Sequence, residues 1–258
     1  VVTSMGGDPS ERSDTLRAEG LRKRYGGLIV LDDVSLSLPN SGRLGVIGPN
    51  GSGKTTLLGA LSGFIPAEGG VWIEGRDLSH ASASRRARAG IARTFQIAAV
   101  VEAWTVYDNI AFAAAAHRKL GWGRCVPLRH NGAVRAEVEQ AAERWGLGEL
   151  LSVPVSELSY GIVRRTELAV ATLGEPRVLL LDEPAAGLSH EEGAGVMQTV
   201  RELFPTTGIV LVEHDMEIMF DFCEELLVLD HGKVIASGDP AEVRADPLVR
   251  EAYLGSVV

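Results

Sequence analysis

The sequence has 258 residues and a mass of 27.5 kDa, which allows one or two domains with a substantial core. Hydrophobic residues make up 45% of the chain and charged residues 23%, which fits a globular protein and excludes a mainly disordered one. The net charge is −9, and such a field repels a nucleic-acid backbone, so the composition predicts no nucleic-acid partner.

The first part of the chain predicts strands, a glycine loop and a helix. Residues 1–14 are polar and are expected to form a disordered lead-in. The alternation over 16–38 predicts an antiparallel hairpin with its turn at 25–27. A short buried strand is predicted at 43–47, followed by a glycine-rich turn and a helix over 55–62.

The stretch from about 100 to 153 predicts a separate helical subdomain, with helices at 106–120 and 134–145. Further helices are predicted at 162–173, 190–203 and 216–223, strands at 178–181 and 209–212, and a hairpin at 225–236. Because strands alternate with helices, the expected fold class is α/β: a mostly parallel sheet, an N-terminal antiparallel β part and an inserted α-helical subdomain.

Two groups of residues carry no evident chemistry. The arginines Arg85, Arg86 and Arg88 are expected to form a solvated face, as most charge runs do. Cys125 and Cys223 lack metal-ligand spacing, so both are expected to be free thiols in a reducing compartment.

The run GPNGSGKTT at 48–56 fits the phosphate-loop pattern G-x-x-x-x-G-K-[ST] and predicts a P-loop NTPase core. Small residues let successive backbone N–H groups curl around phosphate oxygens, and the helix that follows adds its positive dipole end. A glycine-rich surface turn is the alternative, but the strand and helix that the motif requires flank this run. The predicted nucleotide-binding residues of the loop are Gly48, Pro49, Asn50, Gly51, Ser52, Gly53, Lys54, Thr55 and Thr56, with Lys54 directed to the β- and γ-phosphates and Thr55 to Mg²⁺.

Two adjacent carboxylates, Asp182 and Glu183, end the apolar strand predicted at 178–181. A parallel strand would deliver Asp182 to the same sheet edge as the glycine loop, where it can hold Mg²⁺ through water. Glu183 can then polarise a water for in-line attack on the γ-phosphate. Alone, such a pair is more often a helix N-cap region, but the phosphate loop upstream favours the catalytic interpretation.

The segment Leu158-Ser159-Tyr160-Gly161-Ile162 lies between the phosphate loop and the carboxylate strand, directly before a predicted helix. It resembles the signature sequence of the ATP-binding-cassette (ABC) ATPases, and the resemblance covers about residues 16–255. The resemblance implies that Ser159 and Gly161 cap the γ-phosphate of ATP held by a second ATPase subunit. A hydroxyl, a glycine amide and a helix start all favour an anion. An ordinary N-capped helix explains Ser159 equally well in isolation.

Three further positions match the family one at a time. Gln96 resembles the glutamine that contacts Mg²⁺ and the attacking water, His214 the histidine that contacts the γ-phosphate, and Tyr25 the aromatic that stacks on adenine. Without the resemblance they would be a solvated polar residue, a lone histidine and a core aromatic. The implied catalytic residues are Lys54, Gln96, Glu183 and His214, and the implied Mg²⁺ ligands are Thr55, Gln96 and Asp182.

The sequence departs from the family pattern at two positions. Ile162 stands where many members have glutamine, and Ser189 where aspartate is usual in a loop that normally crosses the dimer interface. The first departure removes a polar contact to the partner's nucleotide, and the second bears on communication between the two sites. Since the carboxylates, Gln96 and His214 remain, an active Mg-dependent ATPase is expected.

Finer strings, such as DEPAAGL at 182–188 and EHDM at 213–216, resemble the ATPase subunits of branched-chain amino-acid importers. The resemblance implies a motor subunit that binds and hydrolyses ATP, peripheral on the cytoplasmic face of the cell membrane. Its implied partners are a second ATPase subunit in a homo- or heterodimer, integral membrane permease subunits and, indirectly, a solute-binding protein. The implied organisation is a single domain over 15–258, with its core at 15–97 and 166–258 and its helical subdomain at about 98–165.

Other functions stay open at this point. Close relatives of this subgroup serve urea and short amides, and the solute never touches the ATPase subunit. A soluble ABC ATPase acting on DNA or ribosomes is disfavoured by the single cassette, the lack of a heptad run and the negative charge. Another P-loop enzyme, such as a kinase or GTPase, would leave Ser159 and His214 unexplained.

Overall fold

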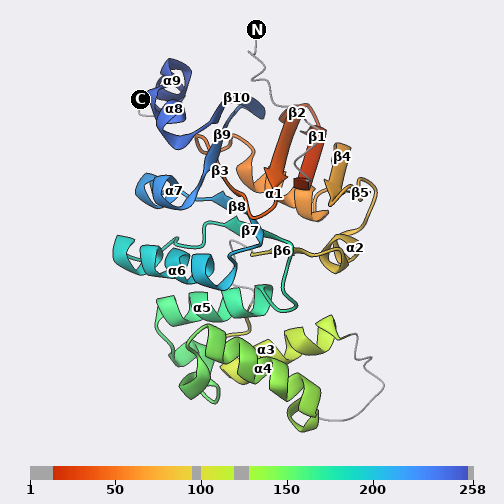
Figure 1. The fold of residues 1–258 in the computed structure, drawn as a ribbon, viewed down its shortest axis with the longest axis vertical. Coiled ribbons are helices and arrows are strands. Elements are labelled where there is room, and N and C mark those ends of the chain that lie inside the picture. The colour runs from red at the N-terminus through yellow and green to blue at the C-terminus, as the bar shows by residue number, and fades with distance from the viewer. Residues whose placement is uncertain (1–13, 95–99, 119–127, 255–258) are drawn as a thin grey trace.

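The computed structural model describes residues 14–94, 100–118 and 128–254. Two β-sheets and a set of helices make up the fold, with α3 (Val106–His117) and α4 (Gly132–Arg144) at one end of the molecule and the sheets at the other (Figure 1). Helix α5 (Tyr160–Ala171) lies between these two helices and α6 (His190–Leu203). The remaining helices are α1 (Lys54–Ser62), α2 (Ala83–Arg88), α7 (Met216–Phe222), α8 (Pro240–Ala245) and α9 (Pro247–Leu254).

The first sheet is antiparallel, with the strand order β2-β1-β4-β5. The expected hairpin is confirmed, since its strands pair from Asp14 with Pro39 to Tyr25 with Leu28. Strand β1 begins at Asp14, so the last residue of the expected lead-in is part of the sheet, and residues 1–13 lie outside the described residues. The strands are β1 (Asp14–Tyr25), β2 (Leu28–Pro39), β4 (Glu68–Ile73) and β5 (Arg76–Asp77).

The second sheet has the order β10-β9-β3-β8-β7-β6. All its pairs are parallel except β10 with β9, which confirms the mostly parallel sheet. The central strands β7 and β8 are buried at every residue, which explains their continuous apolar runs. The strands are β3 (Arg43–Ile47), β6 (Ile91–Arg93), β7 (Val178–Asp182), β8 (Gly208–Val212), β9 (Glu225–Asp230) and β10 (Lys233–Gly238).

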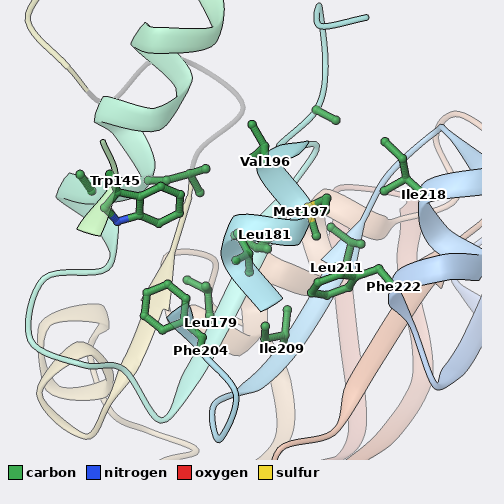
Figure 2. Close-up of a cluster of buried hydrophobic side chains, with 14 of the residues drawn as sticks. Trp145, Leu179, Leu181, Val196, Met197, Phe204, Ile209, Leu211, Ile218 and Phe222 are labelled. Atoms are coloured by element: carbon green, nitrogen blue, oxygen red, sulfur yellow. The ribbon is translucent and has the colours of Figure 1, made fainter. Parts of the chain in front are cut away.

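The hydrophobic core is continuous from the parallel sheet to helices α3, α4 and α5. Figure 2 shows side chains of β7 and β8 against those of α6 and α7, with Trp145 and Phe204 at the side of the helical subdomain. The centroids of those two rings are 6.3 Å apart. Helix α5 runs without a break across residue 165, where the sequence predicts the boundary of the helical subdomain.

No helix of the described residues is long and apolar enough to cross a membrane. Of the two cysteines, Cys223 is a buried free thiol whose pKa burial raises to about 12. Cys125 lies outside the described residues.

The expectation of a solvated arginine face on α2 is wrong for one of its three members. Arg85 and Arg88 are exposed, but Arg86 is 5% exposed. Its Nη1 donates to the carbonyls of Ala60 (2.5 Å) and Leu61 (2.8 Å), in the last turn of α1. Its Nε and Nη2 donate to two carbonyls in the loop before α2. A cation that satisfies the orphan carbonyls of a helix C-terminus stabilises that end, so Arg86 caps the helix that follows the phosphate loop.

We therefore expect Arg86→Met to lower the free energy of unfolding by about 2–4 kcal/mol, because four carbonyls lose the hydrogen bond from the buried guanidinium. The measurement is urea unfolding, and Arg85→Met, which replaces an exposed arginine of the same helix, is the control and is expected to stay within about 0.5 kcal/mol. Equal unfolding midpoints for the two variants would contradict the capping role.

Candidate nucleotide and magnesium site

The site lies where the carboxyl ends of neighbouring strands meet at one edge of the parallel sheet. Strand β3 leads into the phosphate loop, β7 ends at Asp182, and β8 is followed by Glu213 and His214. Strand β6, beside β7, ends at Arg93. This edge is where open α/β sheets bind their ligands, and the topology places four chain segments there that are far apart in sequence.

Two of the three glycines in the phosphate loop, Gly48 and Gly53, could not be replaced by another residue without a clash. A Cβ on Gly48 (φ +151°) would lie 2.0 Å from the carbonyl oxygen of Leu229, and one on Gly53 (φ +110°) would lie 2.6 Å from that of Val30. These close approaches wedge the loop between strands β9 and β2. Three residues of the loop are exposed to solvent: Asn50, Gly51 and Thr55.

Lys54 begins helix α1 and is 7% exposed. Its Nζ donates to the carbonyl oxygens of Gly48 (2.7 Å) and Pro49 (3.1 Å), which holds the ammonium against the loop. Burial lowers the pKa of Lys54, and the nearby carboxylates of Glu183 and Asp182 oppose that shift. The fold therefore brings the Lys54 ammonium close enough to the carboxylates of Asp182 and Glu183 for their charges to interact.

Asp182 is fully buried and held from two sides. Its Oδ2 accepts from Arg93 Nη2 (2.9 Å), and its backbone N–H donates to Thr94 Oγ1 (3.1 Å). Arg93 Nη2 also lies 3.4 Å from the carbonyl oxygen of Thr55, so it connects two of the three expected metal ligands, Thr55 and Asp182. Arg93 and Thr94 precede Gln96 in the sequence, and neither was predicted to be a site residue. Their contacts with Asp182 join residues that are 89 and 88 positions apart along the chain.

The residues present fit Mg²⁺. Within the described part of the chain, Asp182 Oδ1 is buried without a hydrogen-bond partner, and so is Ser52 Oγ in the phosphate loop. Buried polar atoms normally have partners, and Mg²⁺ takes carboxylate and hydroxyl oxygens together with phosphate. The third expected ligand, Gln96, lies outside the described residues.

Glu183 and His214 meet at this edge. His214 Nε2 donates to Glu183 Oε1 over 2.9 Å, and the glutamate side chain is 14% exposed. The Glu183 backbone is in the left-handed region (φ +52°), with its N–H donating to the carbonyl of Val212 (2.8 Å). Both residues predicted for the chemistry of the γ-phosphate are thus in direct contact.

Glu213 is a site residue that sequence reasoning missed. It is buried, and its two carboxylate oxygens accept from the backbone N–H groups of Ala185 (2.6 Å) and His214 (2.9 Å). Burial raises its pKa, against the two backbone hydrogen bonds. The only feature of the sequence that could have identified Glu213 is its position as a charged residue directly after the apolar strand β8. Glu213 holds the His214 backbone against the loop that follows Glu183.

The signature segment starts α5. Ser159 is the N-cap residue, yet its side chain makes no capping hydrogen bond and is exposed, so ordinary capping does not explain it. A Cβ on Gly161 would meet side chains only at 3.7 Å or beyond. Of the two departures, Ile162 packs against the core, and Ser189 forms a capping box with Glu192 at the start of α6. Serine thereby performs the capping that aspartate could also provide.

Tyr25 ends strand β1 and is 51% exposed, so the structure places it at the surface and not in the core. Lys23 Nζ lies 4.9 Å from the centre of its ring.

Comparisons with known proteins agree with this geometry. A family model described as "ABC transporter" matches residues 31–186, and one described as "Branched-chain amino acid ATP-binding cassette transporter" matches 233–258. The chain is 36% identical over 250 residues to the high-affinity branched-chain amino acid transport ATP-binding protein LivG of Salmonella typhimurium, covering 93% of this chain and 97% of that protein. It is 33% identical to BraF of Pseudomonas aeruginosa, a protein of the same description, with the same coverage.

Solved structures agree as well. The ADP conformation of MJ1267, an ATP-binding cassette of an ABC transporter, superimposes with a TM-score of 0.84 at 29% identity, covering 94% of this chain and 99% of that one. CbiO1 of Clostridium perfringens, part of the ABC transporter complex cbiONQ, gives 0.76 at 27% identity, covering 94% and 95%. Similarity of this extent in sequence and in fold shows that the chain belongs to the ABC transporter family, as an ATP-binding ATPase subunit.

Proposed function

We propose that this chain hydrolyses Mg-ATP at the described site to drive the import of branched-chain amino acids. The observation that carries the proposal is the meeting of Lys54, Asp182, Glu183 and His214 at adjacent strand ends, with the Glu183–His214 contact of 2.9 Å. The match of residues 233–258 to the branched-chain family, and the names of the LivG and BraF relatives, support the choice of solute. Urea or short amides, and a soluble non-transport role, are the alternatives.

Each residue has one task in the proposed reaction. The loop amides and the Lys54 ammonium bind the phosphates, while Tyr25 stacks on adenine. The Glu183 carboxylate orients the attacking water and accepts its proton, and the His214 side chain contacts the γ-phosphate. Thr55, Asp182 and Gln96 hold Mg²⁺, which neutralises charge on the phosphate oxygens when bound.

A second ATPase subunit, identical or different, completes the site in this proposal. Ser159 and Gly161 contact the γ-phosphate held by the partner, and the exposed, non-capping hydroxyl of Ser159 supports this role. The start of α5 adds a positive dipole end for the anion. A single subunit is then a slow ATPase, because neither ATP is enclosed.

The permease docks, we propose, in a groove of about 1200 Å³ between the core and the helical subdomain. Its walls come from α2, β6 and α3 and from the segment 173–177 after α5. Arg93 contributes to the lining and also contacts Asp182, so a docked helix would adjoin a residue of the metal site. In this proposal the chain lies on the cytoplasmic face of the membrane, and a solute-binding protein lies on the other side. The division into a core (15–97 and 166–258) and a helical subdomain belongs to the same proposal.

The experiment measures uptake of labelled leucine, and of labelled urea in parallel. The cells carry either the wild-type protein or the Lys54→Ala variant as their only copy of this ATPase. We expect leucine uptake to fall by at least about tenfold in Lys54→Ala, since a charge-assisted contact to phosphate contributes about 1.5–3 kcal/mol. Lys233→Ala is the matched control, because Lys233 is an exposed lysine paired with Asp32 across 3.3 Å. Loss of urea uptake alone would assign the alternative solute, and no change in either would remove the importer proposal.

A further inference from the structure

Arg164 of helix α5 contacts the backbone of the catalytic segment at three successive residues. Its Nη2 donates to the carbonyl oxygens of Glu183 (2.5 Å) and Asp182 (3.3 Å), and its Nε donates to that of Pro184 (2.8 Å). The remaining Nη1 donates to Glu167 Oε2 (2.5 Å), one turn further along the helix. One guanidinium therefore joins α5 to the backbone of Asp182 and Glu183, the two residues whose carboxylates are proposed to act on the phosphates.

This contact is buried and specific for arginine. The side chains of Arg164 and Glu167 are 5% and 8% exposed, and the desolvation of such a pair is compensated only when the remaining donors are satisfied. The planar fork of arginine reaches several acceptors at fixed angles, whereas a lysine ammonium is a single point charge on a flexible stem. The neighbouring Arg165 is partly exposed and makes no hydrogen bond or ion pair with any described residue.

The segment that Arg164 holds contains a strained residue. A non-glycine residue in the left-handed region costs about 1–2 kcal/mol and persists only where its surroundings fix it. At Glu183 the N–H is fixed by Val212 of strand β8, and the carbonyl by Arg164. The direction of the Glu183 side chain toward His214 thus depends on one contact from the sheet and one from α5.

We propose that Arg164 is a positioning residue that couples the nucleotide bound by the partner subunit to the Glu183 of its own chain. The coupling rests on the proposed function, in which Ser159 and Gly161 at the start of α5 contact the partner's ATP. When that contact forms, the position of α5 is fixed, and Arg164 transmits this to the carbonyls of Asp182 and Glu183. Occupation of one ATP site then sets the geometry of the catalytic carboxylate at the other.

The test is steady-state ATP hydrolysis by the purified full-length chain carrying Arg164→Lys. A misplacement of about 1 Å costs roughly 100-fold in rate, so kcat is expected to fall about 10–100-fold. The KM for ATP is expected to stay within about twofold, because the phosphate loop is untouched, and the Hill coefficient for ATP to fall toward one. Arg165→Lys is the matched control and is expected to match the wild type. A kcat and Hill coefficient equal to the wild type would overturn the proposal, and a lower kcat with an unchanged Hill coefficient would overturn the coupling between sites.

A second comparison separates positioning from a structural role. In a Glu183→Gln background, Arg164→Lys is expected to change the residual rate by less than about twofold, since the group that it positions is already removed. The same fold loss in both backgrounds would show that Arg164 does not act through Glu183. If Arg164→Lys does not fold, Glu167→Gln serves instead. This variant keeps the guanidinium of Arg164 but weakens the contact with Glu167 that orients it. A lower kcat with an unchanged KM is again expected, and an unchanged kcat would overturn the proposal.

These outcomes are distinct from a failure of the proposed function. If leucine uptake does not depend on Lys54 but Arg164→Lys selectively loses kcat, the solute is wrong and the role of Arg164 stands. If Glu183→Gln is inactive and Arg164→Lys keeps its kcat, the ATPase site stands and the role of Arg164 is overturned.

Discussion

Replacing Glu183 with glutamine is expected to lower Mg-ATP turnover by about 10²–10⁴-fold while ATP still binds. Glutamine has the size of glutamate and its amide oxygen can accept from His214 Nε2, which lies 2.9 Å from Glu183 Oε1 in the wild type. The amide cannot take a proton from water at neutral pH, so the loss falls on kcat. Phosphate release measures turnover, and titration of the purified chain with ATP measures binding.

The matched control for this variant is Glu224→Gln. Glu224 is an exposed residue directly before strand β9, and its side chain makes no hydrogen bond among the described residues. Its turnover is expected to equal that of the wild type. Retained turnover in Glu183→Gln would refute the role of general base. Loss of ATP binding in that variant would instead show that Glu183 contributes to the affinity for the nucleotide.

The second large effect is expected from Gly48→Ala, which adds a methyl group to the phosphate loop. The added Cβ would lie 2.0 Å from the Leu229 carbonyl oxygen and 2.8 Å from Ser52 Oγ, so strand β9 or the loop must shift. We expect Gly48→Ala to destabilise the fold by about 3 kcal/mol or more, from overpacking and from backbone strain together. ATP binding is expected to be lost, because the displaced loop no longer directs its N–H groups at the phosphates.

Gly75→Ala provides the comparison for this variant. Gly75 also has a positive φ (+74°), but a Cβ there would meet nothing within 4 Å. This change is expected to cost only the left-handed backbone term, about 1–2 kcal/mol, with ATP binding intact. Thermal unfolding measures the stability of the two alanine variants, and ATP titration measures their nucleotide binding. Equal stability and equal ATP binding of the two variants would show that the contact with Leu229 does not shape the loop.

The parts of the fold that follow from local sequence were predictable. The phosphate loop and its helix, the apolar strand that ends at Asp182, and the alternation that makes a parallel sheet are each encoded within a few residues. Strand β4 was not predicted, because its glycines at 69 and 70 resemble a turn. A Cβ on Gly69 would lie 2.5 Å from the Gly20 carbonyl oxygen, so these glycines serve the close approach of β4 to β1.

The contacts that support the catalytic groups could not be predicted in the same way. Arg93 reaches Asp182 across 89 residues, and Arg164 reaches Glu183 across 19. A sequence gives the charge of an arginine but not the carbonyls that its guanidinium meets, which is also why Arg86 was assigned to solvent. Where the fold decides the partner, only three-dimensional structure identifies it.

The course of α5 also has a mechanical meaning. The helix has 12 residues and is therefore about 18 Å long, with neither proline nor a glycine beyond Gly161 to bend it. A helix without such residues is not expected to kink, so a displacement of its first turn at Ser159 would be carried along the helix to Arg164. If the chain divides into a core and a helical subdomain as proposed above, any hinge between them lies outside α5, and a fragment cut at residue 165 would divide this helix.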